Sequence, residues 1–138
     1  MKIYDVTNCT AHIIYPSTSL ATWTKNNVSF AVINASLYNM TTREPVGTII
    51  KNGQLVHEEG EYLGCGIIKE TNKLTFGLPH GKNWKDFLTG YIGPVQNGQY
   101  VKPPFIDQYV FNSKANRIGL GVKANKTYIV TDDAVTLE

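Results

Sequence analysis

The fold class is decided by residues 30–55, which read F-A-V-I-N-A-S-L-Y-N-M-T-T-R-E-P-V-G-T-I-I-K-N-G-Q-L. An apolar run at 30–33 ends in polar residues, and a loop with a Pro-x-Gly segment leads to a second apolar run and an Asn-Gly turn. Short apolar runs bounded by turn residues are typical of core strands. Because ligand-binding groups often follow such strands in α/β folds, Asn34 and Ser36 are the first candidates for ligand contacts.

The rest of the chain consists mainly of further short strand-like runs. The runs predicted as strands are 3–6, 11–15, 30–33, 47–51, 54–57, 62–69, 73–78, 91–96, 99–101, 108–111, 118–123 and 127–131. A helix is predicted over 20–26 after the Ser17-Thr18-Ser19 cap, and a turn or two of helix over 83–88. Asn52-Gly53 and Asn97-Gly98 predict hairpin turns, because type I′ turns need positive φ at both central residues. We therefore predict one domain, 1–138, with an α+β fold of mixed, mostly antiparallel strands and one or two short helices.

The composition is that of an ordinary globular protein with little excess charge. The 138 residues carry a formal net charge of +2, which does not indicate binding to a nucleic acid polymer or a membrane. No apolar run approaches the ~20 residues of a membrane-spanning helix, and Met1-Lys2 leads directly into a strand-like run without a signal peptide. We therefore expect a cytoplasmic protein in which Cys9 and Cys65 are buried free thiols.

Four motifs, taken in order, resemble a known family. They are Asn34-Ala35-Ser36-Leu37-Tyr38; Pro45-Val46-Gly47 followed by Asn52-Gly53; Gly90-Tyr91-Ile92-Gly93-Pro94 followed by Asn97-Gly98-Gln99; and Arg117-Ile118-Gly119-Leu120-Gly121-Val122. This series is similar to that of the phosphodiester glycosidases related to the uncovering enzyme, which removes N-acetylglucosamine from a sugar phosphodiester. The resemblance implies a phosphodiester-glycosidase-like fold over nearly the whole chain.

The resemblance also implies a ligand site. Asn34, Ser36 and Tyr38 alternate and would lie on one face of a strand end, with Asn34 and Ser36 around the sugar and Tyr38 at the border of the pocket. Arg117 would bind the phosphate with its planar guanidinium. Glycines beside it, such as Gly119, would let a ligand approach the strand closely. We expect Asn34, Ser36 and Arg117 to meet in one pocket. The alternatives are an Asx or Ser turn at the strand end and a surface arginine at a strand start.

The remaining chemistry-bearing residues are scattered. His12, His57 and His80 do not have metal-ligand spacing, so neither a metal nor a cofactor is expected. His80 is a candidate ligand contact because it lies in a Gly- and Pro-rich excursion at 77–104. The acid pairs Glu58-Glu59 and Asp132-Asp133 are adjacent rather than opposed, which is unlike a glycosidase dyad.

Two functions remain open, with a structural domain that has no small ligand as a third. The family's Asp-Gly-Gly motif does not occur in the chain. This favours a protein that binds a sugar or nucleotide phosphodiester without cleaving it, for example a phage sponge for a cyclic-nucleotide or ADP-ribose-type immune signal. The alternative is a hydrolase that cleaves a sugar-1-phosphodiester, as an N-acetylglucosaminidase does. Because the chain ends before the family's last core strand, a homo-oligomer is expected to cover the open edge.

Overall fold

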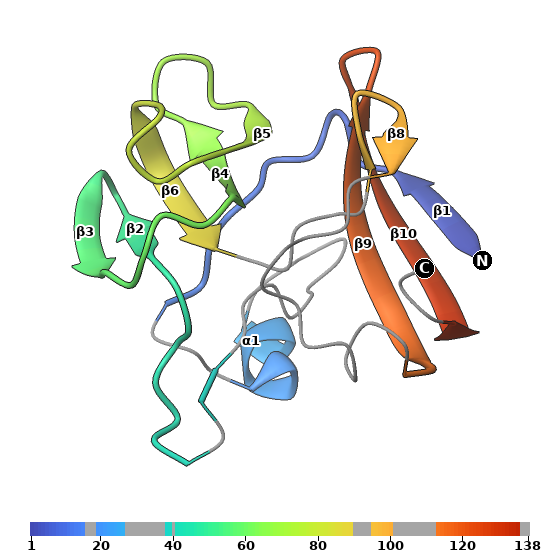
Figure 1. Ribbon diagram of the computed structural model, residues 1–138, viewed down its shortest axis with the longest axis horizontal. Helices are drawn as coiled ribbons and strands as arrows, with labels where there is room; N and C mark the ends of the chain where they lie inside the picture. Colours follow the sequence, from blue (N-terminus) through green and yellow to red (C-terminus); the bar gives the residue numbers. More distant parts are fainter. Residues whose placement is uncertain (16–18, 27–37, 40, 90–94, 101–112, 136–138) are drawn as a thin grey trace. The chain divides into compact units, whose positions relative to one another are not determined.

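The computed structural model describes residues 1–15, 19–26, 38–39, 41–89, 95–100 and 113–135 (Figure 1). Two units are distinguished within it. The central unit is Cys9–Tyr91, and the terminal unit combines Met1–Asn8 with Ile92–Glu138. The expectation of one domain over 1–138 stays a prediction. Within the described residues, no helix has the length and apolar character needed to cross a membrane.

The central unit contains a five-stranded sheet and helix α1 (Leu20–Asn26). All neighbouring strands of the sheet run antiparallel, in the order β3-β2-β6-β4-β5. The strands are β2 (Ile49–Lys51), β3 (Gln54–His57), β4 (Gly64–Ile68), β5 (Leu74–Gly77) and β6 (Trp84–Thr89). The central position of β6 therefore joins the two hairpins β2–β3 and β4–β5 into one sheet.

The core of the described residues lies on this sheet. Its buried hydrophobic side chains are Ile49, Ile67, Trp84, Phe87 and Leu88. Phe87 is 0% exposed, and its ring centroid lies 5.0 Å from that of Trp84. Two glycines of β4 allow the backbone of β6 to approach: a Cβ at Gly64 would lie 2.2 Å from the Leu88 carbonyl oxygen, and one at Gly66 would lie 2.4 Å from that of Asp86.

The terminal unit contains a second antiparallel sheet, in the order β1-β10-β9. Figure 1 shows these three strands side by side. The strands are β1 (Lys2–Asp5), β9 (Ala115–Lys123) and β10 (Lys126–Val135), and a two-stranded ribbon is formed by β7 (Val95–Gln96) and β8 (Gln99–Tyr100). The β9–β10 turn places Ala124 and Asn125 at positive φ. An ion pair of 2.8 Å between the Met1 ammonium and Asp132 helps to attach β1 to β10.

The predicted α+β fold with mostly antiparallel strands is confirmed, and so is the helix at 20–26. Its cap is also as expected, because Ser19 Oγ accepts a hydrogen bond of 3.0 Å from the Thr22 amide. Several strand predictions, such as those at 30–33 and 108–111, fall outside the described residues.

Three expectations about the described residues are wrong. Residues 83–88 are not helical, because most of that segment is β6, a central strand with both faces buried and no alternating polarity. The run at 11–15 is not a strand. Instead, its Ile13 carbonyl accepts a hydrogen bond from Lys51 Nζ. Both cysteines are free, as expected, but Cys9 is exposed rather than buried.

Candidate functional site

Two of the expected ligand contacts, Asn34 and Ser36, lie outside the described residues. The third member of that motif, Tyr38, forms an isolated bridge with Pro45 and is 50% exposed. The Arg43 guanidinium carbon lies 5.8 Å from the centre of the Tyr38 ring. The Tyr38 ring is thus on the surface of the central unit, beside a cation that belongs to the same loop.

His80 lies on the turn between β5 and β6. The segment is tightened by hydrogen bonds to the Leu78 carbonyl from the Gly81 amide and from Trp84 Nε1, each 3.0 Å long. His80 Nε2 lies 3.7 Å from Glu58 Oε1, and both side chains are more than half exposed. The expected long excursion at 77–104 is therefore wrong at 84–89, which form a core strand.

Arg117 lies on β9 with its side chain held in place. Its Nη2 donates to the Ser113 carbonyl oxygen over 2.7 Å and to Ser113 Oγ over 3.3 Å. These bonds fix the direction of a half-buried guanidinium, which reduces the entropy lost on binding an anion.

Two positions without a side chain follow Arg117 on one face of the strand. Because side chains alternate along a strand, Arg117, Gly119 and Gly121 share one face of β9. Their partners on β10 are Asp132, Val130 and Tyr128, respectively. A Cβ at Gly119 or Gly121 would have no described atom within 4 Å beyond its chain neighbours. We call this surface, made of Arg117, Gly119, Gly121, Val130 and Tyr128, the glycine face of β9.

Carboxylates on this side of the sheet are occupied by other groups. Asp132 lies opposite Arg117 and accepts from the Met1 ammonium, a hydrogen bond that lowers the pKa of its carboxyl. Asp5 pairs with Tyr128 on the neighbouring strand, and hydrogen bonds from the Thr7 hydroxyl and amide lower its pKa. Lys126 Nζ lies 3.6 Å from Asp5 Oδ2. Both carboxyl groups are therefore ionised at neutral pH and paired with cations.

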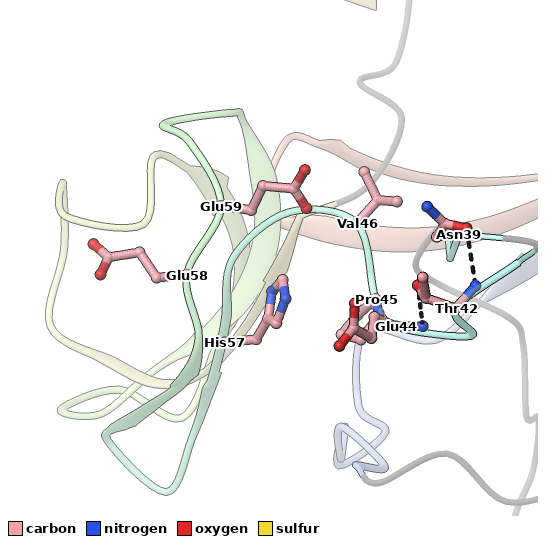
Figure 2. A pocket seen from close by; sticks show the side chains of 8 residues that line it. All are labelled: Asn39, Thr42, Glu44, Pro45, Val46, His57, Glu58 and Glu59. Atoms are coloured by element: carbon pink, nitrogen blue, oxygen red, sulfur yellow. Dashed lines mark hydrogen bonds between the residues drawn. The ribbon is translucent and has the colours of Figure 1, made fainter.

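A cavity of about 300 Å³ lies elsewhere, on the central unit (Figure 2). The residues that line it are Asn39, Thr42, Glu44, Pro45, Val46, His57, Glu58 and Glu59. Its lining includes three glutamates and neither lysine nor arginine within the part of the chain that is described. A phosphodiester would be repelled there, so this cavity is not the expected site.

Two residues of this cavity have a structural role that sequence reasoning did not predict. His57 Nδ1 lies 2.8 Å from the Gly47 carbonyl oxygen, and Glu59 Oε2 accepts from the Gly47 amide over 2.9 Å. Together they hold both backbone polar groups of Gly47, two residues before β2. The Asn52-Gly53 turn could have indicated roughly that His57 lies near Gly47, because the register of a two-residue hairpin brings position 57 opposite position 48. A bulge between Ile49 and Ile50 shifts the pairing, so that His57 lies opposite Ile49.

The cavity does not form an obvious acid–base centre. Figure 2 shows the Glu58 and Glu59 side chains leaving the backbone in opposite directions, as expected for adjacent residues. Glu59 is engaged with the Gly47 amide, and Glu58 faces His80. Across the described ranges, no group of three or more His, Cys, Asp or Glu side chains is arranged to hold a metal ion.

Comparison of the chain with models of known families, with curated proteins and with solved structures finds no match. The resemblance to phosphodiester glycosidases therefore depends only on the quoted motifs. The geometry of the glycine face is independent of that resemblance.

Proposed function

We propose that the protein binds a small sugar or nucleotide phosphodiester on the glycine face of β9 and does not cleave it. One observation carries the proposal: an oriented arginine, Arg117, precedes two glycines on the same face of β9, and Tyr128 is the cross-strand neighbour of the second glycine, Gly121. The residues combine a phosphate-binding group, an uncovered backbone and an aromatic ring on one surface.

The dimensions and the charge of the face suit such a ligand. Gly121 lies four positions after Arg117 along the strand, or about 13 Å, which is enough for a phosphate with a sugar or a base. A guanidinium can donate two parallel hydrogen bonds to the non-bridging oxygens of a phosphodiester. The Tyr128 ring offers an apolar surface for stacking a sugar or a base. Lys123 follows at the end of the same strand and adds positive charge.

The protonation state of the nearby acids supports binding without turnover. A glycosidase needs a general acid that stays protonated near neutral pH, which requires a raised pKa. The hydrogen bonds at Asp132 and Asp5 lower the pKa of both carboxyl groups. Neither can serve as that acid while its partners remain in place. The alternative function, hydrolysis of a sugar-1-phosphodiester, would need an acid from another part of the chain.

The resemblance to phosphodiester glycosidases supports the same ligand class and adds Asn34, Ser36, Tyr38 and His80 as expected contacts. That Asn34, Ser36 and Arg117 meet in one pocket stays a prediction. Under this proposal the protein would act as a sponge for a cyclic-nucleotide or ADP-ribose-type signal in the cytoplasm, that of the host if a phage encodes it.

Binding and cleavage can be tested in one experiment. Calorimetric titration of the full chain with cyclic dinucleotides, ADP-ribose and N-acetylglucosamine-1-phosphodiesters would identify a ligand, and mass spectrometry after several hours would show its fate. Arg117→Ala should weaken binding about 10- to 150-fold, the loss of one or two charge-assisted hydrogen bonds. Lys114→Ala, an exposed cation just before β9, is the matched control and should bind normally.

A second variant separates binding from folding. Gly119→Val places a side chain on the open face, where no described atom would clash, and valine favours strands. We expect an unchanged circular dichroism spectrum and strongly reduced ligand binding. Normal binding by this variant would exclude the glycine face, and release of a free sugar by the wild-type protein would establish the hydrolase instead.

We also infer that the protein self-associates. Strand β9 lies at the edge of its sheet within the described residues, and its opposite face exposes Ile118 by 52% and Val122 by 44%. An unpaired edge with apolar neighbours is commonly covered by a second copy. Sedimentation equilibrium would test this, and a monomer at about 100 μM would contradict it.

A further inference from the structure

A second cavity on the central unit has the opposite charge to the first. It measures about 360 Å³ and is lined by Asn52, Gly53, Lys69, Asn72 and Lys85. These residues come from the β2–β3 turn, the β4–β5 turn and β6. We propose that this cavity is a binding site for a phosphate group, either free or as the monoester of a small molecule. The inference does not depend on the function proposed for β9.

Both turns are attached to the same short segment of β6. The Gly53 amide donates to the Lys85 carbonyl over 2.7 Å, and the Lys69 amide donates to the Asn83 carbonyl over 3.0 Å. Asn52 and Asn72 have φ of 52° and 54°, a conformation that asparagine accepts more readily than most residues. The cavity walls are therefore fixed by backbone bonds, and two side-chain amides stand beside two lysines.

The lysines of this cavity are not neutralised. Among the described residues, no carboxylate lies within 4.0 Å of Lys69 Nζ or Lys85 Nζ. Lys85 Nζ donates instead to the neutral Asn72 Oδ1 over 3.2 Å, which orients the ammonium and leaves its charge uncompensated. Lys69 and Lys85 line the same cavity, so an anion bound there would be attracted by both charges.

The nearby acids are engaged with other groups. Asp86 is 2% exposed, accepts from the Asn52 amide over 2.9 Å and lies 4.0 Å from Lys51 Nζ. Glu70 accepts a hydrogen bond from Asn83 Nδ2. Neither lines the cavity. Ammonium groups and amide N–H groups are donors that suit a phosphate, which offers acceptor oxygens on every side.

The size of the cavity limits the ligand. A volume of about 360 Å³ admits a phosphate with a small organic group, within the range of small-molecule pockets. The two lysines would match the charge of a monoester dianion better than that of a diester, which carries one negative charge. The expected ligand class is therefore a phosphate monoester or free phosphate.

Titration of the ¹⁵N-labelled full chain with inorganic phosphate, at constant ionic strength, tests the proposal. We expect amide shifts to concentrate on Asn52, Gly53, Lys69 and Asn72, and a titration with sodium chloride should not reproduce them. Lys69→Gln with Lys85→Gln should weaken phosphate binding at least about tenfold. The matched control, Lys25→Gln with Lys82→Gln, removes two exposed cations of the same unit and should leave binding unchanged.

A further variant guards against misfolding of the lysine pair mutant. Asn72→Asp tolerates the same backbone conformation and places a carboxylate beside Lys85, so it should also abolish phosphate binding while both lysines remain. A parallel titration with glucose 1-phosphate distinguishes a phosphate ester from free phosphate as the ligand. If glucose 1-phosphate binds more tightly than inorganic phosphate, the site is assigned to an ester. If it binds equally or more weakly, the site is assigned to the free anion.

Three results would overturn the proposal. One is an equal response to phosphate in the wild type, the Lys69/Lys85 double variant and the Asn72→Asp variant. Another is a phosphate response lost in Arg117→Ala but kept in the lysine variant, which would place the anion on the glycine face. The third is binding of a single-stranded oligonucleotide without any response to phosphate or glucose 1-phosphate, which would make this a nucleic-acid surface.

Discussion

The two sheets of this protein differ in what covers them. The five buried side chains of the hydrophobic core among the described residues, Ile49, Ile67, Trp84, Phe87 and Leu88, belong to the central sheet, β3-β2-β6-β4-β5. The terminal sheet, β1-β10-β9, exposes Ile3, Tyr4, Ile118 and Val122, and a Cβ at Gly119 or Gly121 would meet no described atom within 4 Å beyond its chain neighbours. We therefore expect the central sheet to supply most of the stability, and under the proposed function the terminal sheet presents backbone and charge to a ligand. The four predictions below test this division.

The largest effect is expected from Phe87→Ala. Phe87 is 0% exposed in the middle of β6, so truncation leaves a cavity and should cost about 3–5 kcal/mol of unfolding free energy. Urea unfolding followed by tryptophan fluorescence measures it, because Trp23 and Trp84 both belong to the central unit. Ile118→Ala on β9 is the control and should cost less than about 1 kcal/mol. Similar losses in the two variants would mean that the terminal sheet is packed as tightly as the central one.

The second prediction compares the two thiols. Burial raises the pKa of the Cys65 thiol on β4 to about 11. At pH 8 about one thiol in a thousand is then ionised, and alkylation by iodoacetamide should be correspondingly slow. The exposed Cys9 should react first, and Cys65 should follow only in urea. Mass spectrometry of a time course would show this order, and simultaneous labelling of both residues in the native protein would show that the central sheet opens.

The third prediction concerns glycines in the two sheets. Gly66→Ala would bring a Cβ to 2.4 Å from the Asp86 carbonyl oxygen, so β4 and β6 would have to separate. We expect a loss of about 1–3 kcal/mol, the usual cost of overpacking. Gly121→Ala has no such neighbour among the described atoms and should be neutral or slightly stabilising. Thermal unfolding of the pair gives the comparison, and a destabilised Gly121→Ala would indicate that something covers the glycine face.

Only part of the fold could be predicted from the sequence, and that part depends on local chemistry. The helix at 20–26 and the hairpin turns at Asn52-Gly53 and Asn97-Gly98 follow from local chemistry, since Asn52 and Asn97 both adopt positive φ. Strand β6 was misread because burial on both faces removes the alternation that identifies a strand. Its position between β2 and β4 depends on pairings distant in sequence, which no local pattern reports.

One candidate site could be found from the sequence, and the other could not. Arg117 and Gly119 could be found from alternation along one strand, and the hairpin register then brings Val130 opposite Gly119. The cavity lined by Lys69 and Lys85 could not be found, because Lys69 comes from the β4–β5 turn and Lys85 from β6, and the two meet at one cavity only after the sheet has formed. Side chains gathered from several elements have no signature in the spacing of a single segment.

The smallest effect on stability is expected at the edge of the terminal sheet, where an ion pair attaches β1 to β10. The Met1 ammonium lies 2.8 Å from Asp132 Oδ1, and this hydrogen bond lowers the pKa of the carboxyl below its ordinary value of 3.8. A group whose pKa is lower in the folded state stabilises the protein above its unfolded pKa, and this contribution is lost as the pH falls through the folded pKa. Asp132→Asn should therefore reduce stability slightly at about pH 6, and this loss should become smaller as the pH falls toward about 2. Urea unfolding followed by far-ultraviolet circular dichroism at the two pH values measures this, with Asp133→Asn as the exposed neighbouring control. A loss that is the same at both pH values would show that Asp132 acts through its shape rather than its charge. The attachment of β1 would then depend on packing, which would weaken the distinction between the two sheets.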